Sequence, residues 1–339
     1  MAMTRTRTST RAGEGTGAGA TGIGAGAAGA GTGTTGTGTI MAGTTGAGMI
    51  AGTGIQARKG TRERLTSGLK LVAIIVLASV IVSAVLTGCS GSMGKREFKV
   101  GLECAYAPFN WTQNDDSNGA VPIGDGTFAG GFDVEIAKRI ADGLDRKLVI
   151  VKTEWEGLLP AVTSGKIDAI IAGMSPTDER KESIDFSDNY YISDLVIVVR
   201  KDSGFANAQS LQDFSGAKIT GQLSTFHYTV IDQIPGVQKQ TAMDDFPTMI
   251  AALTSGKIDG YVSERPGAIS AQVSNPDLTF IGFDAGRGFE YSDDDAAIAV
   301  GLKKNSEFTP KINDILKNLS DNERQSLMEN AVKTQPATD

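Results

Sequence analysis

The sequence has few of the side chains that catalyse reactions or bind transition metals. Its 339 residues include one histidine, His227, and two cysteines, Cys89 and Cys104. Zinc sites take several His or Cys ligands, so we expect no metal site, and nothing in the sequence calls for a cofactor. No second histidine or cysteine pairs with His227 to activate a nucleophile. We therefore expect His227 to be a packed or surface helix residue and not a catalyst.

Positive charge is also scarce. The chain has 32 Lys and Arg against 39 Asp and Glu, a net charge of −7. Residues 1–89 contain 8 of the basic and 2 of the acidic residues, so residues 90–339 contain 24 and 37 and carry −13. An acidic domain without a basic run is a poor partner for nucleic acid. We expect no nucleic-acid partner.

The first 57 residues lack side chains that could form a core. They are mostly Gly, Thr and Ala, and 18 of the 43 glycines precede residue 61. Such a segment cannot offset the entropy lost on ordering. We interpret residues 1–57 as a disordered tail or as the result of a start codon assigned too early, since Met49 could also begin the chain.

Residues 58–89 have the composition of an export signal. A basic flank at 58–70 precedes 16 residues without charge, 71–86. A membrane-crossing helix needs about 20 apolar residues, so the short run favours a secretion signal over a lone transmembrane anchor. The ending Leu-Thr-Gly-Cys at 86–89 resembles the bacterial lipobox. This resemblance implies that Cys89 is acylated and becomes the new N-terminus, which places the protein on the outer face of the cell membrane.

The two cysteines in an exported chain would normally suggest a disulfide. If Cys89 carries lipid, none can form, and Cys104 is expected to be a free, buried thiol that packs like a small hydrophobe. Residues 90–97 are expected to be a polar linker.

Beyond the linker, short apolar runs alternate with helical patterns, which predicts parallel α/β units. Residues 98–102 and 148–151 are expected to be strands. Apolar residues of 132–144 fall on one helical face, with Asp133 in the first turn. The glycine-rich stretch 119–131 is expected to be a loop and not a phosphate cradle, because no Lys-Ser/Thr follows it.

One internal repeat indicates two similar lobes. Residues 159–168 and 250–259, 91 positions apart, both end in Thr-Ser-Gly-Lys-Ile-Asp. Each copy predicts an apolar helix stopped by a glycine, Gly165 or Gly256. At this spacing the repeat favours two α/β lobes over a solenoid of short units.

Each copy also predicts a strand, 167–172 or 258–262. Five residues beyond the shared aspartate the copies reach Gly173 and Glu264. Open α/β sheets bind ligands at the carboxyl ends of their strands. Two lobes that present these ends to each other would form a ligand-binding cleft.

The stretch 175–180 predicts an anion site at the start of a helix. Ser175 is a suitable N-cap, Pro176 fits the first helical position, and acidic residues follow. Free amide hydrogens and the helix dipole favour an anion there. The guanidinium of Arg180 could bind a carboxylate through two hydrogen bonds. An ordinary capped surface helix is the alternative.

The second lobe offers complementary groups. A strand-to-helix turn with hydroxyl caps is expected at 222–225, and Glu264 provides a carboxylate opposite the positive elements. A zwitterion needs this arrangement, with guanidinium and amides for its carboxylate and an acid for its ammonium.

Five motifs occur in order and together are highly specific. They are Glu103-Cys-Ala-Tyr-Ala-Pro-Phe109, Gly131-Phe-Asp-Val-Glu135, Trp155-Glu-Gly-Leu-Leu-Pro160, Ala172-Gly-Met-Ser-Pro-Thr-Asp-Glu-Arg180 and Asp185-Phe-Ser-Asp-Asn-Tyr-Tyr191. From residue 98 to about 330 the chain resembles family 3 extracellular solute-binding proteins, which include the lysine/arginine/ornithine-, histidine- and glutamine-binding proteins of ABC importers. The resemblance implies a two-lobed α/β fold of the type II periplasmic-binding-protein (Venus-flytrap) kind that closes over one amino acid. Lobe 1 would be 98–192 plus 291–339 and lobe 2 would be 193–290, joined by two hinge strands.

The resemblance also implies how the ligand's backbone is held. Arg180 would bind the α-carboxylate, helped by the backbone amides of Ser175 and Thr225. Glu264 would take the α-ammonium, with a carbonyl from Gly173. Many relatives have Asp in place of Glu264 and Ser or Thr in place of Gly173, so the ammonium could sit differently and one hydroxyl contact is absent.

The side-chain pocket follows from the same resemblance. Tyr106 and Trp155 match its aromatic walls, Met174 belongs to the ligand-binding set, and Glu103 matches the acid at its floor. An enclosed carboxylate needs a positive partner, and a guanidinium stacks on aromatic faces and meets a carboxylate in two hydrogen bonds. We therefore expect a basic amino acid, arginine before lysine. Glutamine is the main rival, and cystine is a further alternative.

The resemblance implies a lipid-anchored receptor, without enzymatic activity, that acts as a monomer with the permease subunits of an ABC importer. A lipobox on such a receptor favours a Gram-positive cell. Two other classes of protein are alternatives to a receptor. A cyclohexadienyl-dehydratase-like enzyme on the same fold would need a further acid, and no clear one is evident. A sensor module of a membrane kinase or channel would need a second transmembrane segment, which the sequence does not contain after the domain.

Overall fold

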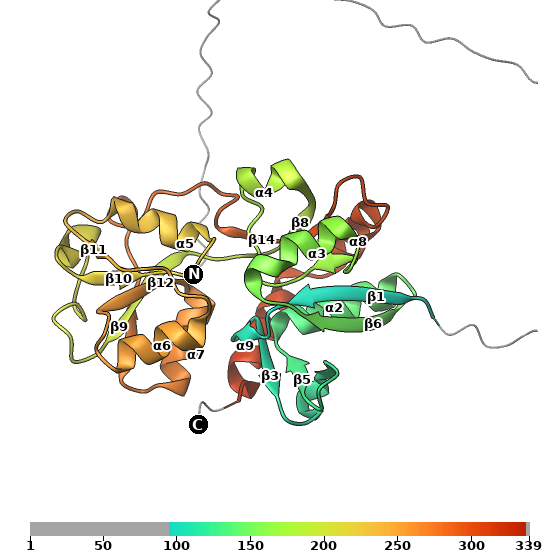
Figure 1. Cartoon of the computed structure of the whole chain (residues 1–339), viewed down its shortest axis with the longest axis horizontal. Coiled ribbons are helices and arrows are strands. Elements are labelled where there is room, and N and C mark those ends of the chain that lie inside the picture. The colour runs from blue at the N-terminus through green and yellow to red at the C-terminus, as the bar shows by residue number, and fades with distance from the viewer. Residues whose placement is uncertain (1–94, 337–339) are drawn as a thin grey trace, which may run out of the picture. The chain divides into compact units, whose positions relative to one another are not determined.

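The computed structural model describes residues 95–336 (Figure 1). The predicted tail, the export signal, Cys89 and most of the linker lie outside the described residues. Within 95–336 no helix has the length and apolar character needed to span a membrane.

The first sheet is built mainly from βαβ units, as the sequence predicted. Across the sheet its strands are β6 (Lys147–Lys152), β1 (Glu97–Leu102), β7 (Ala169–Ile170), β14 (Ala297–Lys303) and β8 (Ile184–Ile192). β1 pairs in parallel with β6 and β7, and helices α2 (Phe132–Gly143) and α3 (Leu158–Ser164) connect these strands. β14 runs antiparallel to β7 and β8.

The second sheet repeats this plan. Across the sheet its strands are β11 (Gln238–Lys239), β10 (Lys218–Thr220), β12 (Gly260–Glu264), β9 (Leu195–Arg200) and β13 (Leu278–Ile281). β10 is parallel to β11 and β12, whereas β9 runs antiparallel to β12 and β13. Its helices are α5 (Phe226–Thr229), α6 (Phe246–Thr254) and α7 (Arg265–Ser274).

The chain passes from the first sheet to the second between β8 and β9 and returns between β13 and β14. In Figure 1, β1 and β6 lie on the right and β10 and β11 on the left. We call the two halves lobe 1 and lobe 2. Their predicted boundaries, 192/193 and 290/291, remain a prediction.

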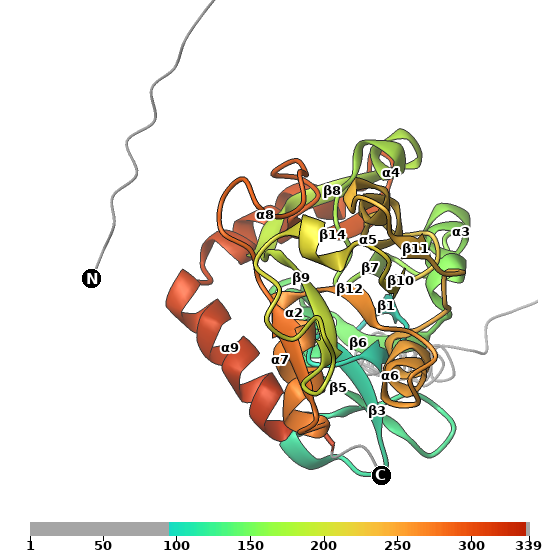
Figure 2. The same ribbon diagram turned by 90° about the vertical axis from the view of Figure 1, so that its left-hand side faces the viewer.

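The remaining strands and α-helices belong to lobe 1. They are a small antiparallel sheet, β2 (Ala105–Tyr106), β3 (Asn110–Gln113), β5 (Phe128–Gly130) and β4 (Val121–Pro122), and the helices α4 (Asp178–Ser183), α8 (Phe308–Lys317) and α9 (Asp321–Thr334). α9 runs beside α7 of lobe 2 (Figure 2), where the Gln335 amide donates to the Ser270 carbonyl at 3.1 Å.

Most predicted elements are confirmed, and three differ in detail. The expected loop 119–131 contains the short strands β4 and β5. The strands expected at 167–172 and 258–262 are Ala169–Ile170 and Gly260–Glu264. In both cases the strand starts later than predicted because the residues after the helix first form its C-terminal cap. The capping glycines, Gly165 and Gly256, are left-handed, with φ of +78° and +74°.

Cys104 is buried and is a free cysteine, as expected. Burial raises the pKa of its thiol to about 12, so the thiol is neutral and packs as a small apolar group.

Candidate ligand-binding site

The carboxyl ends of the central strands carry the candidate site residues. Glu103 directly follows β1 and Gly173 lies three residues after β7, both in lobe 1. In lobe 2, Gln222 lies two residues after β10 and Glu264 is the last residue of β12. The repeat therefore located correctly the strand ends at which Gly173 and Glu264 lie.

Arg180 is buried where the two lobes meet. Its Nη1 donates to the carbonyl of Ser175 at 2.9 Å, and its Nη2 donates across the cleft to the carbonyl of Ser224 at 3.2 Å. The guanidinium carbon lies 5.1 Å from the centre of the Trp155 ring. Burial lowers the pKa of Arg180 to about 10, so the group remains a cation at neutral pH and is held in a fixed orientation.

The predicted helix cap next to Arg180 was placed two residues too early. Thr177, not Ser175, is the N-cap of α4, and its Oγ1 accepts from the Arg180 backbone N–H. Ser175 instead donates its hydroxyl to the Asp295 carbonyl at 2.8 Å. Pro176 precedes the cap and disfavours a helical conformation at its neighbour Ser175. Met174 is buried, and its carbonyl accepts from the amide of Ala299.

At the other strand end, Glu264 contacts both lobes. The Tyr106 hydroxyl of lobe 1 donates to Glu264 Oε2 at 2.8 Å. Glu264 Oε1 has no hydrogen-bond partner among the described residues, and His227 Nε2 lies 3.6 Å from it. His227 is 5% exposed and packs against Phe226 and Phe246. It is therefore a packed residue, as expected, but one that adjoins the candidate ammonium site.

The Tyr106 ring fits between two glycines. A Cβ on Gly173 would lie 3.0 Å from its Cε1, and one on Gly267 of α7 would lie 3.1 Å from its Cε2. The ring also stacks on Phe246 of lobe 2, with centroids 4.0 Å apart and planes 7° apart. The absence of a side chain at Gly173 is thus explained by the space that Tyr106 occupies.

Glu103 is a buried acid with one free oxygen. Its Oε2 accepts from the amide of Gln222 at 3.0 Å, and its Oε1 has no hydrogen-bond partner among the described residues. Burial raises the pKa of Glu103 to about 8, against the lowering effect of the Gln222 hydrogen bond. A donor on a ligand could satisfy the free oxygen.

A second layer holds the lobe 1 residues in place. The Asp133 carboxylate accepts from the Tyr190 hydroxyl at 2.7 Å and from the Asn110 amide at 2.9 Å. Tyr190 in turn accepts from the Gly173 N–H, and Asn110 accepts from the Cys104 N–H. One buried carboxylate thus connects the turn after β7 with the turn that follows Glu103.

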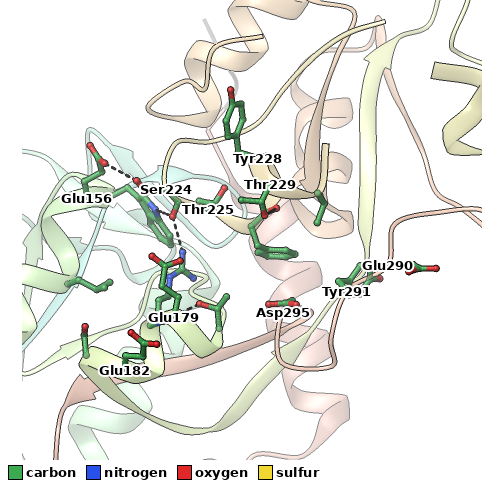
Figure 3. A pocket seen from close by; sticks show the side chains of 17 residues that line it. Glu156, Glu179, Glu182, Ser224, Thr225, Tyr228, Thr229, Glu290, Tyr291 and Asp295 are labelled. Atoms are coloured by element: carbon green, nitrogen blue, oxygen red, sulfur yellow. Dashed lines mark hydrogen bonds between the residues drawn. The ribbon is translucent and has the colours of Figure 1, made fainter. Parts of the chain in front are cut away.

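A cavity of about 680 Å³ opens between the lobes (Figure 3). Of the predicted site residues, Trp155, Arg180 and Thr225 line it. The others do not, and they are Glu103, Tyr106, Gly173, Met174, Ser175 and Glu264. The Thr225 hydroxyl donates to the Gln222 carbonyl at 2.7 Å, which fixes the turn before α5. Five carboxylates also line the cavity, those of Glu156, Glu179, Glu182, Glu290 and Asp295.

Ser224 of lobe 2 is the point at which three lobe 1 side chains converge. Its carbonyl accepts from Trp155 Nε1 at 3.3 Å as well as from Arg180, and its hydroxyl donates to Glu156 Oε1 at 2.8 Å (Figure 3). These contacts exist only while the lobes are together. They therefore stabilise the closed arrangement and orient Arg180 within it.

We expect Glu156→Ala to weaken ligand binding about fivefold, because one charge-assisted hydrogen bond of about 1 kcal/mol across the cleft is lost. The loss should arise from faster dissociation, measured by stopped-flow fluorescence. Glu156→Gln keeps an acceptor for Ser224 and serves as the matched control. Equal dissociation rates in Glu156→Ala and the wild type would contradict this role.

Sequence reasoning did not assign three residues of the site. Glu103 is contacted by Gln222, and Tyr106 is contacted by Phe246. Asp133 accepts from the Tyr190 hydroxyl, which in turn accepts from the Gly173 N–H. Gln222 lies in the turn that the sequence singled out, so its position was a usable signal. Asp133 was predicted as a first-turn helix residue within a family motif, and Phe246 precedes the helix predicted from the repeat. Nothing local indicates that either supports the site.

Two lobes that meet over a buried guanidinium and two buried carboxyl groups, Glu264 and Glu103, are typical of a protein that encloses a small polar solute. Residues 98–332 match the bacterial extracellular solute-binding proteins, family 3, and the chain belongs to this family. It is a binding protein and not an enzyme.

Relatives of known structure or name agree with this assignment. The arginine-binding extracellular protein ArtP of Bacillus subtilis is 29% identical over 259 residues, 74% of this chain and 92% of ArtP. The amino acid ABC transporter substrate-binding protein AbpA of Streptococcus pneumoniae, solved bound to L-arginine, has a TM-score of 0.60 at 28% identity and covers 70% of this chain and 94% of its own. An ancestral arginine-binding protein solved bound to glutamine has a TM-score of 0.57 at 28% identity, and the match covers 69% of this chain and 96% of the ancestral protein. The type II two-lobed fold is thereby confirmed, and the chain is an amino-acid ABC transporter substrate-binding protein.

Proposed function

We propose that this protein captures free L-arginine in the cleft between its lobes and delivers it to the permease of an ABC importer. The observation that carries the proposal is the buried Glu103 carboxyl group, whose Oε1 has no hydrogen-bond partner among the described residues. A buried carboxylate needs a positive or donor partner, and a guanidinium presents donors on a planar fork.

The surroundings of the cavity support a cationic ligand. Five carboxylates line it, and Arg180, the basic residue among its lining, already donates to two backbone carbonyls. Clefts with one sign of charge raise the local concentration of oppositely charged ligands and their association rates. ArtP is named as an arginine-binding protein, and AbpA was solved bound to L-arginine.

The remaining site residues fit the backbone of an amino acid. Arg180 and the amides of Ser175 and Thr225 would hold the α-carboxylate, and Glu264 with the Gly173 carbonyl would hold the α-ammonium. Trp155 would provide an aromatic face for the side chain. Tyr106 already stacks on Phe246, and Gly173 and Gly267 adjoin the two edges of its ring, so it would meet the ligand through its hydroxyl.

Glutamine is a second candidate, and two observations favour it. The pKa of Glu103 is about 8, so at neutral pH the group is mostly a neutral acid, which can face an amide. The ancestral relative was solved with glutamine.

Thermal unfolding in the presence of each of the twenty amino acids tests the proposal. A ligand that binds only the folded state raises its stability by about 2.7 kcal/mol at 100 times its dissociation constant. We expect arginine to give the largest rise in Tm and lysine the next. A larger rise with glutamine would contradict the arginine assignment, and no rise with any amino acid would contradict the receptor function.

We also propose that Cys89 carries diacylglycerol after removal of residues 1–88, and that the lipid anchors the protein to the outer face of the membrane. Cys89→Ser should then release the protein into the medium, because stable anchoring depends on acyl chains worth about 0.8 kcal/mol per buried methylene. Fractionation of cells that express both forms measures this. A Cys89→Ser protein that stays in the membrane unprocessed would show a transmembrane anchor instead.

A further inference from the structure

Gln222 is a buried polar residue between the two lobes to which no role has been assigned. It is 2% exposed and lies in lobe 2, opposite Glu103 in lobe 1. Its backbone is fixed on both sides, since the Leu223 N–H donates to the Met243 carbonyl at 2.8 Å and the Gln222 carbonyl accepts from Thr225 at 2.7 Å. The position of its side chain is therefore set by lobe 2.

The orientation of its amide is also determined. Nε2 donates to the Asp244 backbone carbonyl and to Glu103 Oε2, both at 3.0 Å. A carbonyl can only accept a hydrogen bond. The nitrogen must therefore face Asp244, and the same nitrogen then presents its second hydrogen to Glu103.

A fixed N–H donor distinguishes the two ionisation states of Glu103. It stabilises the carboxylate. It offers no acceptor to the proton of a neutral acid, because the amide would have to flip its oxygen toward Glu103 and give up the hydrogen bond to the Asp244 carbonyl. It also occupies Oε2 and leaves Oε1 as the one oxygen without a partner. Glu103 thus presents one oxygen, Oε1, that is free to accept from a ligand.

We propose that Gln222 determines the charge preference of the site: its amide favours the anionic form of Glu103 and leaves it one free oxygen, so that cationic side chains bind in preference to neutral ones. This inference rests on the proposed function, because it assumes that Glu103 meets the side chain of the ligand. Gln222 is a positioning residue, since it acts through Glu103.

The electrostatics of Glu103 agree with this role. After burial, which is the largest influence and raises the pKa of Glu103, the Gln222 hydrogen bond is the next largest and lowers it. The charged groups Asp245, Glu154 and Asp133 all raise this pKa. Of these influences, Gln222 alone favours the anion.

The test compares Gln222→Met with wild type by calorimetric titration of arginine and of glutamine between pH 6 and 9.5. Methionine has a similar length and no donor. We expect arginine binding at pH 7.5 to weaken about tenfold or more, because a hydrogen bond to a charged group is lost, and glutamine binding to change less than threefold. The pH midpoint of arginine binding should rise by about one unit or more. The matched control is Gln238→Met, at the exposed residue of β11, which should leave the affinity for both ligands unchanged.

Three results overturn the proposal. Arginine and glutamine could weaken by the same factor with an unchanged pH midpoint, which is what loss of lobe packing alone would produce. Gln222→Met could change the ratio of arginine affinity to glutamine affinity by the same factor in a Glu103→Gln protein as in the wild type. The Glu103→Gln protein has no carboxylate at this position, so the effect would not act through Glu103. The wild type could bind neither ligand, in which case the proposed function fails first. If Gln222→Met unfolds at the assay temperature, Gln222→Leu is used with the same expectations.

Discussion

Arg180→Ala is expected to abolish detectable binding of arginine while the protein stays folded. The change removes the buried guanidinium, so the Ser175 and Ser224 carbonyls lose their donor. The ligand's carboxylate would then be enclosed without a countercharge. Truncating one partner of a buried, hydrogen-bonded charge pair costs about 2–5 kcal/mol, or about 30- to 4,000-fold in affinity. Calorimetric titration measures the loss.

The control for this change is Arg139→Ala on α2. Arg139 is a partly exposed arginine that pairs with Glu135 at 3.5 Å, so its replacement removes the same side chain away from the cleft. It should leave the affinity within about twofold of wild type, as expected for an exposed ion pair. Arginine binding of normal strength by Arg180→Ala would mean that the ligand site lies elsewhere.

Arginine affinity is expected to increase with pH through about 8, and Glu103→Gln is expected to remove both this dependence and most of the affinity. The pKa of Glu103 is raised to about 8 by burial, so below this pH the carboxyl group must lose a proton before it can pair with a guanidinium. Proton linkage then weakens binding by up to about tenfold for each pH unit below the pKa. From pH 9 to pH 6 the wild type should lose about 100-fold in arginine affinity.

Two comparisons separate Glu103 from other titrating groups. Glutamine, which has no side-chain charge, should show a much smaller change over the same pH range. Glu154→Gln removes an exposed carboxylate near Glu103 and should keep the wild-type pH profile with a slightly lower midpoint. A Glu103→Gln protein that retains full arginine affinity at pH 9 would contradict the assignment of Glu103 to the ligand's side chain.

The repeat explains why so much of the fold could be predicted. Two copies of one helix-glycine-strand pattern gave both lobes, and Gly165 and Gly256 end their helices in the left-handed conformation that the pattern requires. The cap of α4 was placed wrongly because Ser175 and Thr177 are both good N-cap residues. Only the tertiary contact of Ser175 with the Asp295 carbonyl decides between them.

The contacts across the cleft could not be predicted from local sequence. Tyr106 contacts Glu264, and Glu103 contacts Gln222, over separations of 158 and 119 residues. Each pair joins strand ends of different lobes, so it depends on how the lobes meet. The family resemblance indicated which residues face the ligand, but not which of them bond to each other.

Isothermal titration of L-arginine into the purified wild-type protein at pH 8.5 tests the central claim most directly. At this pH Glu103 is mostly ionised, so the site is in its proposed binding form. We predict one arginine bound per chain, with an affinity in the micromolar range or tighter, corresponding to about −8 kcal/mol or more, and weaker binding of lysine and glutamine. No heat of binding with arginine, or tighter binding of glutamine, would contradict the account.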